Sequence, residues 1–170
     1  MSAESAPLIV SALLASQDFA WLDGLRRAHY PAERNRVPAH MTLFRHLPPS
    51  LAPELKGRLA EATRARRPSA RTIGLIDLDG GVAVRIASPE LEATRAELAL
   101  SFAGLLTPQD IAGWLPHVTI QNKVPPAEAR RLRAELAANF VQRPISIEGL
   151  AIWAYRDGRW EPHSRHMFRI

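Results

Sequence analysis

The sequence predicts a bilobed α+β fold in which two pseudo-two-fold related strand–helix units place antiparallel sheets along a central groove. Three observations carry this prediction. The tripeptide His-x-Thr occurs twice in similar alternating segments, the surroundings of the two copies repeat in register, and turn residues join later strands into hairpins. Because 170 residues suit one domain with a sizeable core, we expect residues 1–170 to form a single domain of two lobes.

The repeat extends well beyond the tripeptide. The segment PAHMTLF holds His40 and Thr42, and the segment LPHVTIQ holds His117 and Thr119. A Pro-Pro pair follows each histidine at the same offset, and a helical pattern then begins in the same phase. The equivalent positions are Pro48 and Pro125, Pro49 and Pro126, Leu55 and Leu132, Lys56 and Arg133, Leu59 and Leu136, and Ala60 and Ala137. This agreement favours a duplicated unit over coincidence.

Each element of the first half follows from a local pattern. The apolar run LIVSALL predicts a buried strand at 8–14, and apolar residues at helical spacing predict a helix at 17–29. The stretch YPAERNRVP at 30–38 combines prolines with polar residues and predicts a loop. The first alternating His segment predicts a strand at 40–46, and the pattern after it predicts a helix at 51–66.

The second half begins with a hairpin. Two alternating segments, 71–78 and 81–87, are joined at Asp79, Gly80 and Gly81, which favour a tight turn. Pro89 suits the first turn of a helix predicted at 89–105. The remaining expectations are a loop at 107–115, the second His strand at 117–123, a helix at 126–140, and two strands at 145–155 and 159–169 that turn at Asp157 and Gly158.

Composition limits the partners and the chemistry. The formal net charge is +5 and nearly all basic residues are arginine, which favours an anionic partner such as RNA or a nucleotide. The absence of cysteine excludes disulfides, thiol catalysis and cysteine-ligated zinc. The apolar run near the N-terminus lacks preceding basic residues and is too short to span a bilayer. We therefore expect no membrane association, a cytoplasmic location and a monomer.

The paired motifs suggest proton transfer around a phosphate. Residues i and i+2 of a strand share one face, so His40 and Thr42 project together, as do His117 and Thr119. Histidine titrates near neutral pH and can act as either base or acid in phosphodiester cleavage. The two hydroxyls can donate to the non-bridging oxygens, where negative charge develops. This chemistry requires no metal and no cofactor.

These residues carry a family resemblance. His40-Met-Thr42-Leu-Phe44 and His117-Val-Thr119-Ile, within duplicated strand–helix units, resemble the two-histidine (2H) phosphoesterases. The branch most similar to this chain is the bacterial 2′-5′ RNA ligase and RNA 2′,3′-cyclic phosphodiesterase (LigT-like) group. The resemblance implies that the two histidines are the acid/base pair and the two threonines the phosphate contacts. It also implies substrates with RNA 2′,3′-cyclic phosphate ends, 2′-5′ linkages or small cyclic nucleotides.

Strand parity adds candidates for substrate contacts. Phe44 and His46 share the face of His40 if its strand stays regular, and Phe44 is equally suited to stacking on a base or to the core. His46 is the weaker candidate and is expected at the surface. Gln121 and Lys123 share the face of His117 in the same way.

The other candidate site residues lie on later strands or point away from the two motifs. Tyr155 is a candidate for the groove wall, whereas Trp153 fits the core better. Arg45 points away from His40 by strand parity and is discounted. His163 and His166 have a metal-like spacing, but they occupy opposite faces of a predicted strand, so we expect no metal site.

We expect a metal-independent phosphodiesterase that hydrolyses RNA 2′,3′-cyclic phosphate ends to 2′-phosphates, with reversible 2′-5′ RNA ligation as a second activity. One alternative is a cyclic phosphodiesterase for a small nucleotide. A second, from another class, is a non-catalytic RNA- or nucleotide-binding module, whose RNA affinity would depend on salt and survive loss of either histidine. A third is a structural α+β protein whose repeat reflects duplication alone.

Overall fold

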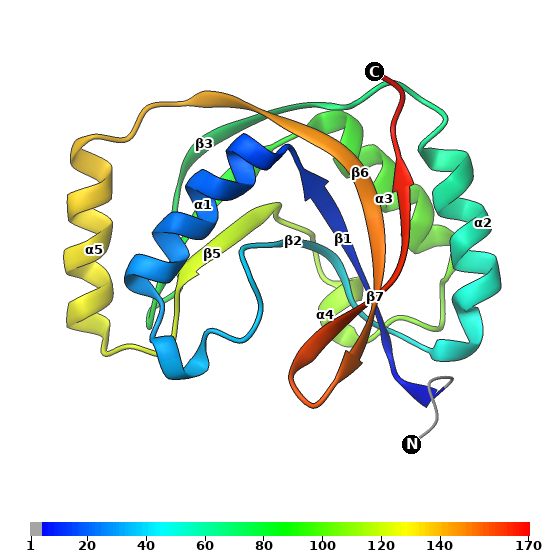
Figure 1. The fold of residues 1–170 in the computed structure, drawn as a ribbon, viewed down its shortest axis with the longest axis horizontal. Coiled ribbons are helices and arrows are strands. Elements are labelled where there is room, and N and C mark those ends of the chain that lie inside the picture. Colours follow the sequence, from blue (N-terminus) through cyan, green and yellow to red (C-terminus); the bar gives the residue numbers. More distant parts are fainter. Residues whose placement is uncertain (1–4) are drawn as a thin grey trace.

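The computed structural model describes residues 5–170, which contain seven strands and five α-helices (Figure 1). Residues 1–4 of the predicted domain lie outside the described residues. The strands are β1 (Leu8–Leu14), β2 (Met41–Leu47), β3 (Ser69–Asp77), β4 (Val82–Ala87), β5 (His117–Gln121), β6 (Arg143–Arg156) and β7 (Arg159–Met167). The helices are α1 (Ser16–His29), α2 (Ala52–Ala62), α3 (Pro89–Ser101), α4 (Pro108–Ile111) and α5 (Pro126–Ala138), with short 3-10 turns η2 (Ala32–Arg34) and η3 (Pro49–Leu51).

The strands form one sheet in the order β2-β1-β6-β3-β4-β5, and β7 pairs with β6. All strand pairs are antiparallel, and helices separate most of the strands, which confirms the predicted α+β class. The long strand β6 arches across the molecule and joins both parts of the sheet (Figure 1). Its first residues pair with β3, and its later residues pair with β1 and β7.

The same topology occurs twice. The first half runs β1-α1-β2-α2, and the second runs β4-α3-β5-α5 with the short helix α4 inserted before β5. In each half the first strand pairs antiparallel with the strand that carries His-x-Thr. The two His-x-Thr strands, β2 and β5, stand at opposite ends of the strand order. This repetition supports the proposal of two lobes within one domain.

Predicted and observed elements agree in kind and differ mainly at their ends. The helix expected at 51–66 ends at Ala62, where the hydroxyl of Thr63 donates to the Leu59 carbonyl at 2.8 Å. The helix expected at 89–105 ends at Ser101, and Gly104 then adopts a φ of 85°, which a helix does not allow. The loop expected at 107–115 contains α4, which begins at Pro108.

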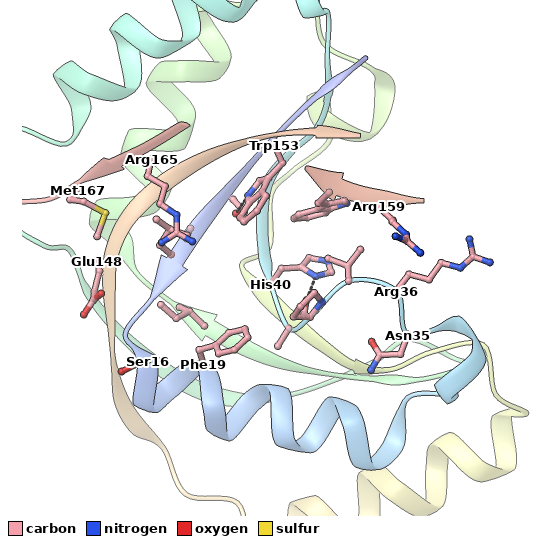
Figure 2. A pocket seen from close by; sticks show the side chains of 18 residues that line it. Ser16, Phe19, Asn35, Arg36, His40, Glu148, Trp153, Arg159, Arg165 and Met167 are labelled. Carbon is pink, nitrogen blue, oxygen red and sulfur yellow. Dashed lines mark hydrogen bonds between the residues drawn. The ribbon is translucent and has the colours of Figure 1, made fainter. Parts of the chain in front are cut away.

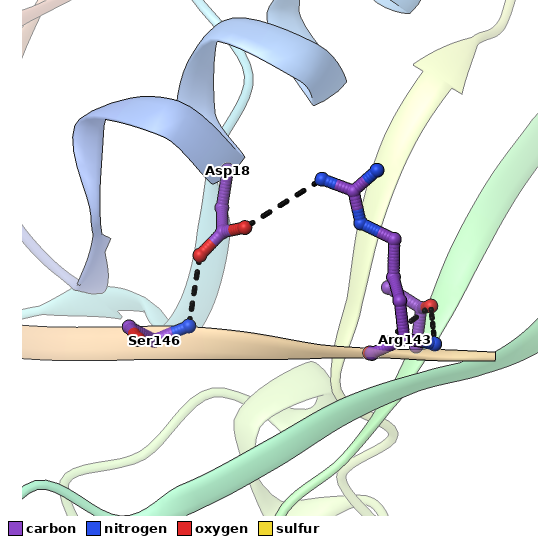
Figure 3. Close-up of polar contacts among 4 residues, drawn as sticks. Asp18, Arg143 and Ser146 are labelled. Carbon is purple, nitrogen blue, oxygen red and sulfur yellow. Dashed lines mark hydrogen bonds and ion pairs between the residues drawn. The ribbon is translucent and has the colours of Figure 1, made fainter.

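Helix α1 is fastened to β6 near the start of both elements (Figure 3). The backbone N–H of Ser146 donates to Asp18 at 2.8 Å, and the Arg143 guanidinium pairs with the same carboxylate at 3.7 Å. The Arg143 guanidinium also lies 3.8 Å from the centre of the Trp21 ring. These contacts orient α1 along the sheet, so that its last turn approaches β5.

The core confirms the predicted burial around both motifs. Met41 and Leu43 beside the first motif, and Val118 and Ile120 beside the second, are almost completely buried in one apolar cluster. Burial of these side chains anchors the two strands to the core, while the polar residues between them face a cavity.

Candidate active site

The two His-x-Thr segments meet at one cavity of about 500 Å³. His40, Thr42, His117 and Thr119 all line it, and each of the four side chains is partly exposed to it. Strands at opposite ends of the strand order thus contribute equivalent residues to one site. Aromatic side chains complete much of the wall, and these are Trp114, Tyr155 and Trp160.

Both histidines have the same hydrogen bond and therefore the same neutral tautomer. Nδ1 of His40 lies 2.8 Å from the carbonyl of Pro38, and Nδ1 of His117 lies 2.7 Å from the carbonyl of Leu115. A carbonyl oxygen can only accept, so Nδ1 must be the donor in each ring. In the neutral rings Nε2 is then left unprotonated, and it can accept a proton as a neutral base or donate one as an imidazolium.

The surroundings of His40 favour its neutral form. Burial lowers the pKa of His40 to about 4, against the opposing effect of its hydrogen bond to Pro38, and the positive charges of Arg26, His117 and Arg45 lower it further. The ring also packs against Trp160, with ring centres 4.4 Å apart and a tilt of 50°. His40 is therefore held in a fixed position and deprotonated near neutral pH.

Each His-x-Thr strand contains a β-bulge immediately after the threonine. Ser11 pairs with Thr42 but Val10 pairs with Phe44, so Leu43 is the extra residue of β2. In β5, Ala83 pairs with Thr119 but Val82 pairs with Gln121. Ile120 is the extra residue there, at the position equivalent to Leu43. The duplication therefore extends to this irregularity of the backbone.

The bulges overturn two of the predicted substrate contacts. Phe44 is 0% exposed and packs in the core, with the Arg95 guanidinium 4.5 Å from its ring centre. Gln121 is 3% exposed and does not line the cavity. Both predictions assumed regular alternation past the threonine, and the inserted residue turns the next side chain to the opposite face.

The same reversal brings Arg45 to the site, and a second extra residue between Phe44 and Leu47 keeps His46 on the face that strand parity predicted. Arg45 and His46 both line the cavity with exposed side chains, so discounting Arg45 was wrong. The carboxylate of Asp110 fixes this part of β2 by accepting from the backbone N–H groups of Arg45 at 3.0 Å and His46 at 3.1 Å. Asp110 is 3% exposed and gave no sign of this role in the sequence.

Of the two other predicted substrate contacts, Tyr155 lies at the predicted cavity and Lys123 does not. Lys123 follows β5 with a φ of 65° and lines another cavity with Tyr30, Glu33 and Arg34, so it does not lie beside His117. Tyr155 lines the cavity that holds both histidines, as expected for a groove wall, with 45% of its surface exposed. Trp153 is half-buried, and its indole N–H donates to Ser11 Oγ at 2.7 Å.

Two buried arginines hold the outer edges of the His-x-Thr strands, and each comes from the other half of the chain. Arg26 of α1 donates to the Thr119 carbonyl of β5 at 2.9 Å. Arg95 of α3 donates to the Leu43 carbonyl of β2 at 3.1 Å, and to the Asp110 carbonyl at 2.7 Å. These bonds satisfy carbonyls that an edge strand leaves without a ladder partner.

Trp114 adds a third bond of this kind, from its indole N–H to the Thr42 carbonyl at 2.9 Å. The sequence reasoning missed Arg26, Arg95 and Trp114 as site-forming residues. The one available indication was that Arg26 falls in helical phase with Leu22, which is completely buried.

Two features of residues 5–170 bear on metals and membranes. Residues 5–170 hold no group of three or more histidine, aspartate or glutamate side chains arranged for a metal ion. His163 and His166 lie on β7, where Nε2 of His166 is 3.0 Å from Ser164 Oγ. In the same part of the chain, every helix is too short or too polar to cross a bilayer.

Comparisons with known proteins agree with this architecture. Residues 14–159 match the 2′-5′ RNA ligase superfamily. The chain is similar in fold to TT0787 of Thermus thermophilus, at 18% identity and a TM-score of 0.62, with 96% of this chain and 98% of that chain covered. It is also similar to Escherichia coli LigT complexed with ATP, at 17% identity and a TM-score of 0.59, with 99% and 100% covered.

A second structure of Escherichia coli LigT, complexed with 3′-AMP, gives 16% identity and a TM-score of 0.56, with 98% of this chain and 99% of that chain covered. A search of curated proteins found no match. The family match and the shared fold confirm the resemblance to LigT-like 2H phosphoesterases that the sequence predicts. Because the match covers most of its length, this chain belongs to the 2′-5′ RNA ligase superfamily.

Proposed function

We propose that this protein is a metal-independent phosphodiesterase that opens 2′,3′-cyclic phosphates at RNA ends to 2′-phosphates, with reversible 2′-5′ ligation as a second activity. One observation carries the proposal. His40 and His117 line a single cavity from two strands, and each donates its Nδ1 proton to the carbonyl two residues earlier. Two imidazoles with matched tautomers form a set that can remove one proton and deliver another.

The lowered pKa of His40 supports the role of base for this residue and leaves the role of acid to His117. His40 enters neutral and takes the proton from water as the water oxygen bonds to phosphorus. His117 acts as the acid and donates a proton to O3′ as the bond between phosphorus and O3′ breaks. The product keeps the phosphate on O2′, and the two histidines exchange their protons with solvent. In ligation, the 5′-hydroxyl of a second RNA takes the place of water.

Three groups in the cavity suit the phosphate itself. The hydroxyls of Thr42 and Thr119 face the same space as the two imidazoles, and each can donate to a non-bridging oxygen. The guanidinium of Arg45 adds a positive charge on the same wall. Together they favour the negative charge that builds up in the transition state.

The test is turnover of an RNA 2′,3′-cyclic phosphate with EDTA present. His40→Ala and His117→Ala should each lose most of the activity, and His29→Ala, outside the cavity, is the matched control. Retained activity in either cavity variant would contradict the proposal. Loss of wild-type activity in EDTA, restored by a divalent metal, would contradict metal independence.

A small cyclic nucleotide is the second candidate substrate. The catalytic cavity alone, at about 500 Å³, has the capacity of a site for one small ligand. Escherichia coli LigT has been crystallised with the nucleotides ATP and 3′-AMP, which supports nucleotides as the partner class. The remaining rival, a non-catalytic binding module, predicts RNA affinity without turnover, and the same assay separates it from both enzymes.

A further inference from the structure

A second and larger cavity adjoins the catalytic one (Figure 2). Its volume is about 1080 Å³, and it shares His40 and Trp160 with the catalytic cavity as a common wall. It lies between α1, the loop before β2, and the β6–β7 hairpin. No group proposed for phosphate chemistry other than His40 lines it. The second cavity is therefore space beside the reacting phosphate that the chemistry itself does not use.

Three arginines give this cavity a positive lining. Figure 2 shows Arg36 and Arg159 together at one end and Arg165 at the other. Among residues 5–170 none of the three has an ion-pair partner. The one acidic side chain in the lining, Glu148, is paired with Arg67 at 3.8 Å. Unpaired guanidinium groups at both ends suit a ligand with more than one phosphate.

Aromatic rings lie between these charges. Trp153 and Phe19 stand on opposite sides of the cavity in Figure 2, and Phe19 is 37% exposed. Trp160 continues the row, with its ring centre 4.4 Å from that of His40 and 6.1 Å from that of Trp153. Aromatic faces in a basic groove are the arrangement on which successive bases of single-stranded nucleic acid stack.

We propose that this second cavity binds the single-stranded RNA segment that flanks the reacting phosphate, so that the preferred substrate is an oligonucleotide. The inference rests on the proposed phosphodiesterase function and chooses between its two candidate substrates. The catalytic cavity has room for one nucleotide, whereas the second cavity adds about twice that volume next to His40. A mononucleotide at the reacting phosphate leaves Arg165, at the far end, without a phosphate.

Binding is measured with a fluorescent RNA hexamer that ends in a 2′-phosphate, so the assay does not depend on turnover. Phe19→Ala removes a stacking face and Arg165→Gln removes a phosphate contact, and each should weaken binding about tenfold. Arg165→Gln should also flatten the dependence of affinity on salt. The matched controls are Leu100→Ala and Arg131→Gln, which change exposed side chains outside every cavity described.

Turnover then separates the two substrates. The wild type should process the oligonucleotide cyclic phosphate with a kcat/KM at least about tenfold above that of the mononucleotide. Phe19→Ala and Arg165→Gln should lose this advantage and keep mononucleotide turnover unchanged. Equal kcat/KM for both substrates in the wild type, or hexamer affinity unchanged in both variants, overturns the RNA site. If neither substrate turns over while both variants weaken hexamer binding, the proposed function fails and the RNA site stands.

Discussion

The lowered pKa of His40 couples the candidate site to the stability of the fold. Burial lowers this pKa from 6.5 to about 4, and unfolding returns the imidazole to water, where its usual proton affinity is restored. As the pH falls, the unfolded chain therefore binds a proton before the folded chain does. The contribution of His40 to stability is fully present above a pH of 6.5, declines as the pH falls towards about 4, and changes no further below that value.

The size of the effect follows from the two pKa values. One pKa unit corresponds to about 1.4 kcal/mol, so the complete loss is about 3 kcal/mol. From about pH 7.5 to about pH 5 the unfolded imidazole becomes protonated while the folded one stays neutral, and His40 alone should remove about 2 kcal/mol. This is a large fraction of the stability of a domain, which is usually about 5–15 kcal/mol.

The assay is urea unfolding of the wild type and His40→Asn at these two pH values. The asparagine amide can still donate to the Pro38 carbonyl but cannot titrate, so the variant should lose about 2 kcal/mol less than the wild type. Subtraction cancels His163 and His166, whose pKa values burial also lowers. His46→Asn, which replaces an exposed histidine of the same cavity, is the matched control for loss of a histidine side chain. Equal losses in the wild type and His40→Asn would refute a lowered pKa of His40 in the folded protein.

Three further substitutions test the geometry of the site. Thr42→Val keeps the side-chain shape, and in cyclic-phosphate kinetics kcat should fall at least about tenfold, because a hydrogen bond to a charged oxygen is worth about 1.5–3 kcal/mol. Arg26→Met removes a positive charge, so the pKa of His40 in an NMR titration should rise, whereas Arg27→Met, on the exposed side of α1, should leave it in place. Asp110→Asn weakens the acceptor for two backbone N–H groups and should lower the free energy of unfolding in urea by about 1–3 kcal/mol; an unchanged value would show that this carboxylate does not hold β2.

Local periodicity predicted much of the fold because most elements obey one period from end to end. The apolar alternation around both motifs identified the strands, and Met41 and Val118 are buried as that alternation requires. The hairpin was also predictable from Asp79, Gly80 and Gly81, and Asp79 adopts a φ of 70°, in the left-handed region that aspartate tolerates better than most residues. The local sequence was sufficient to predict those strands and turns whose conformation depends on residues close to them in the chain.

Strand parity failed at one step, and it failed in both copies. Up to Thr42 and Thr119 each side chain lies on its predicted face, and past them the bulges place Phe44 and Gln121 in the interior. The extra residue is defined by the pairing with β1 or β4, so the sequence of the bulged strand alone does not reveal it. The same step hid Arg45, which parity directed away from the cavity that it lines.

Arg26 and Arg95, each bonded to the His-x-Thr strand of the other half, explain why both halves are needed for one site. The outer edge of β5 is held by Arg26 from the first half of the chain, and the outer edge of β2 is held by Arg95 and Trp114 from the second. Each half pairs its own first strand with one edge of its His-x-Thr strand, and the donors to the carbonyls of Thr42, Leu43 and Thr119 come from the helix or loop of the other half. Any displacement of one half therefore loosens the strand that carries the histidine of the other. The duplicated unit thus supplies two equivalent strands, and the exchange of donors between the halves fixes the position of His40 relative to His117.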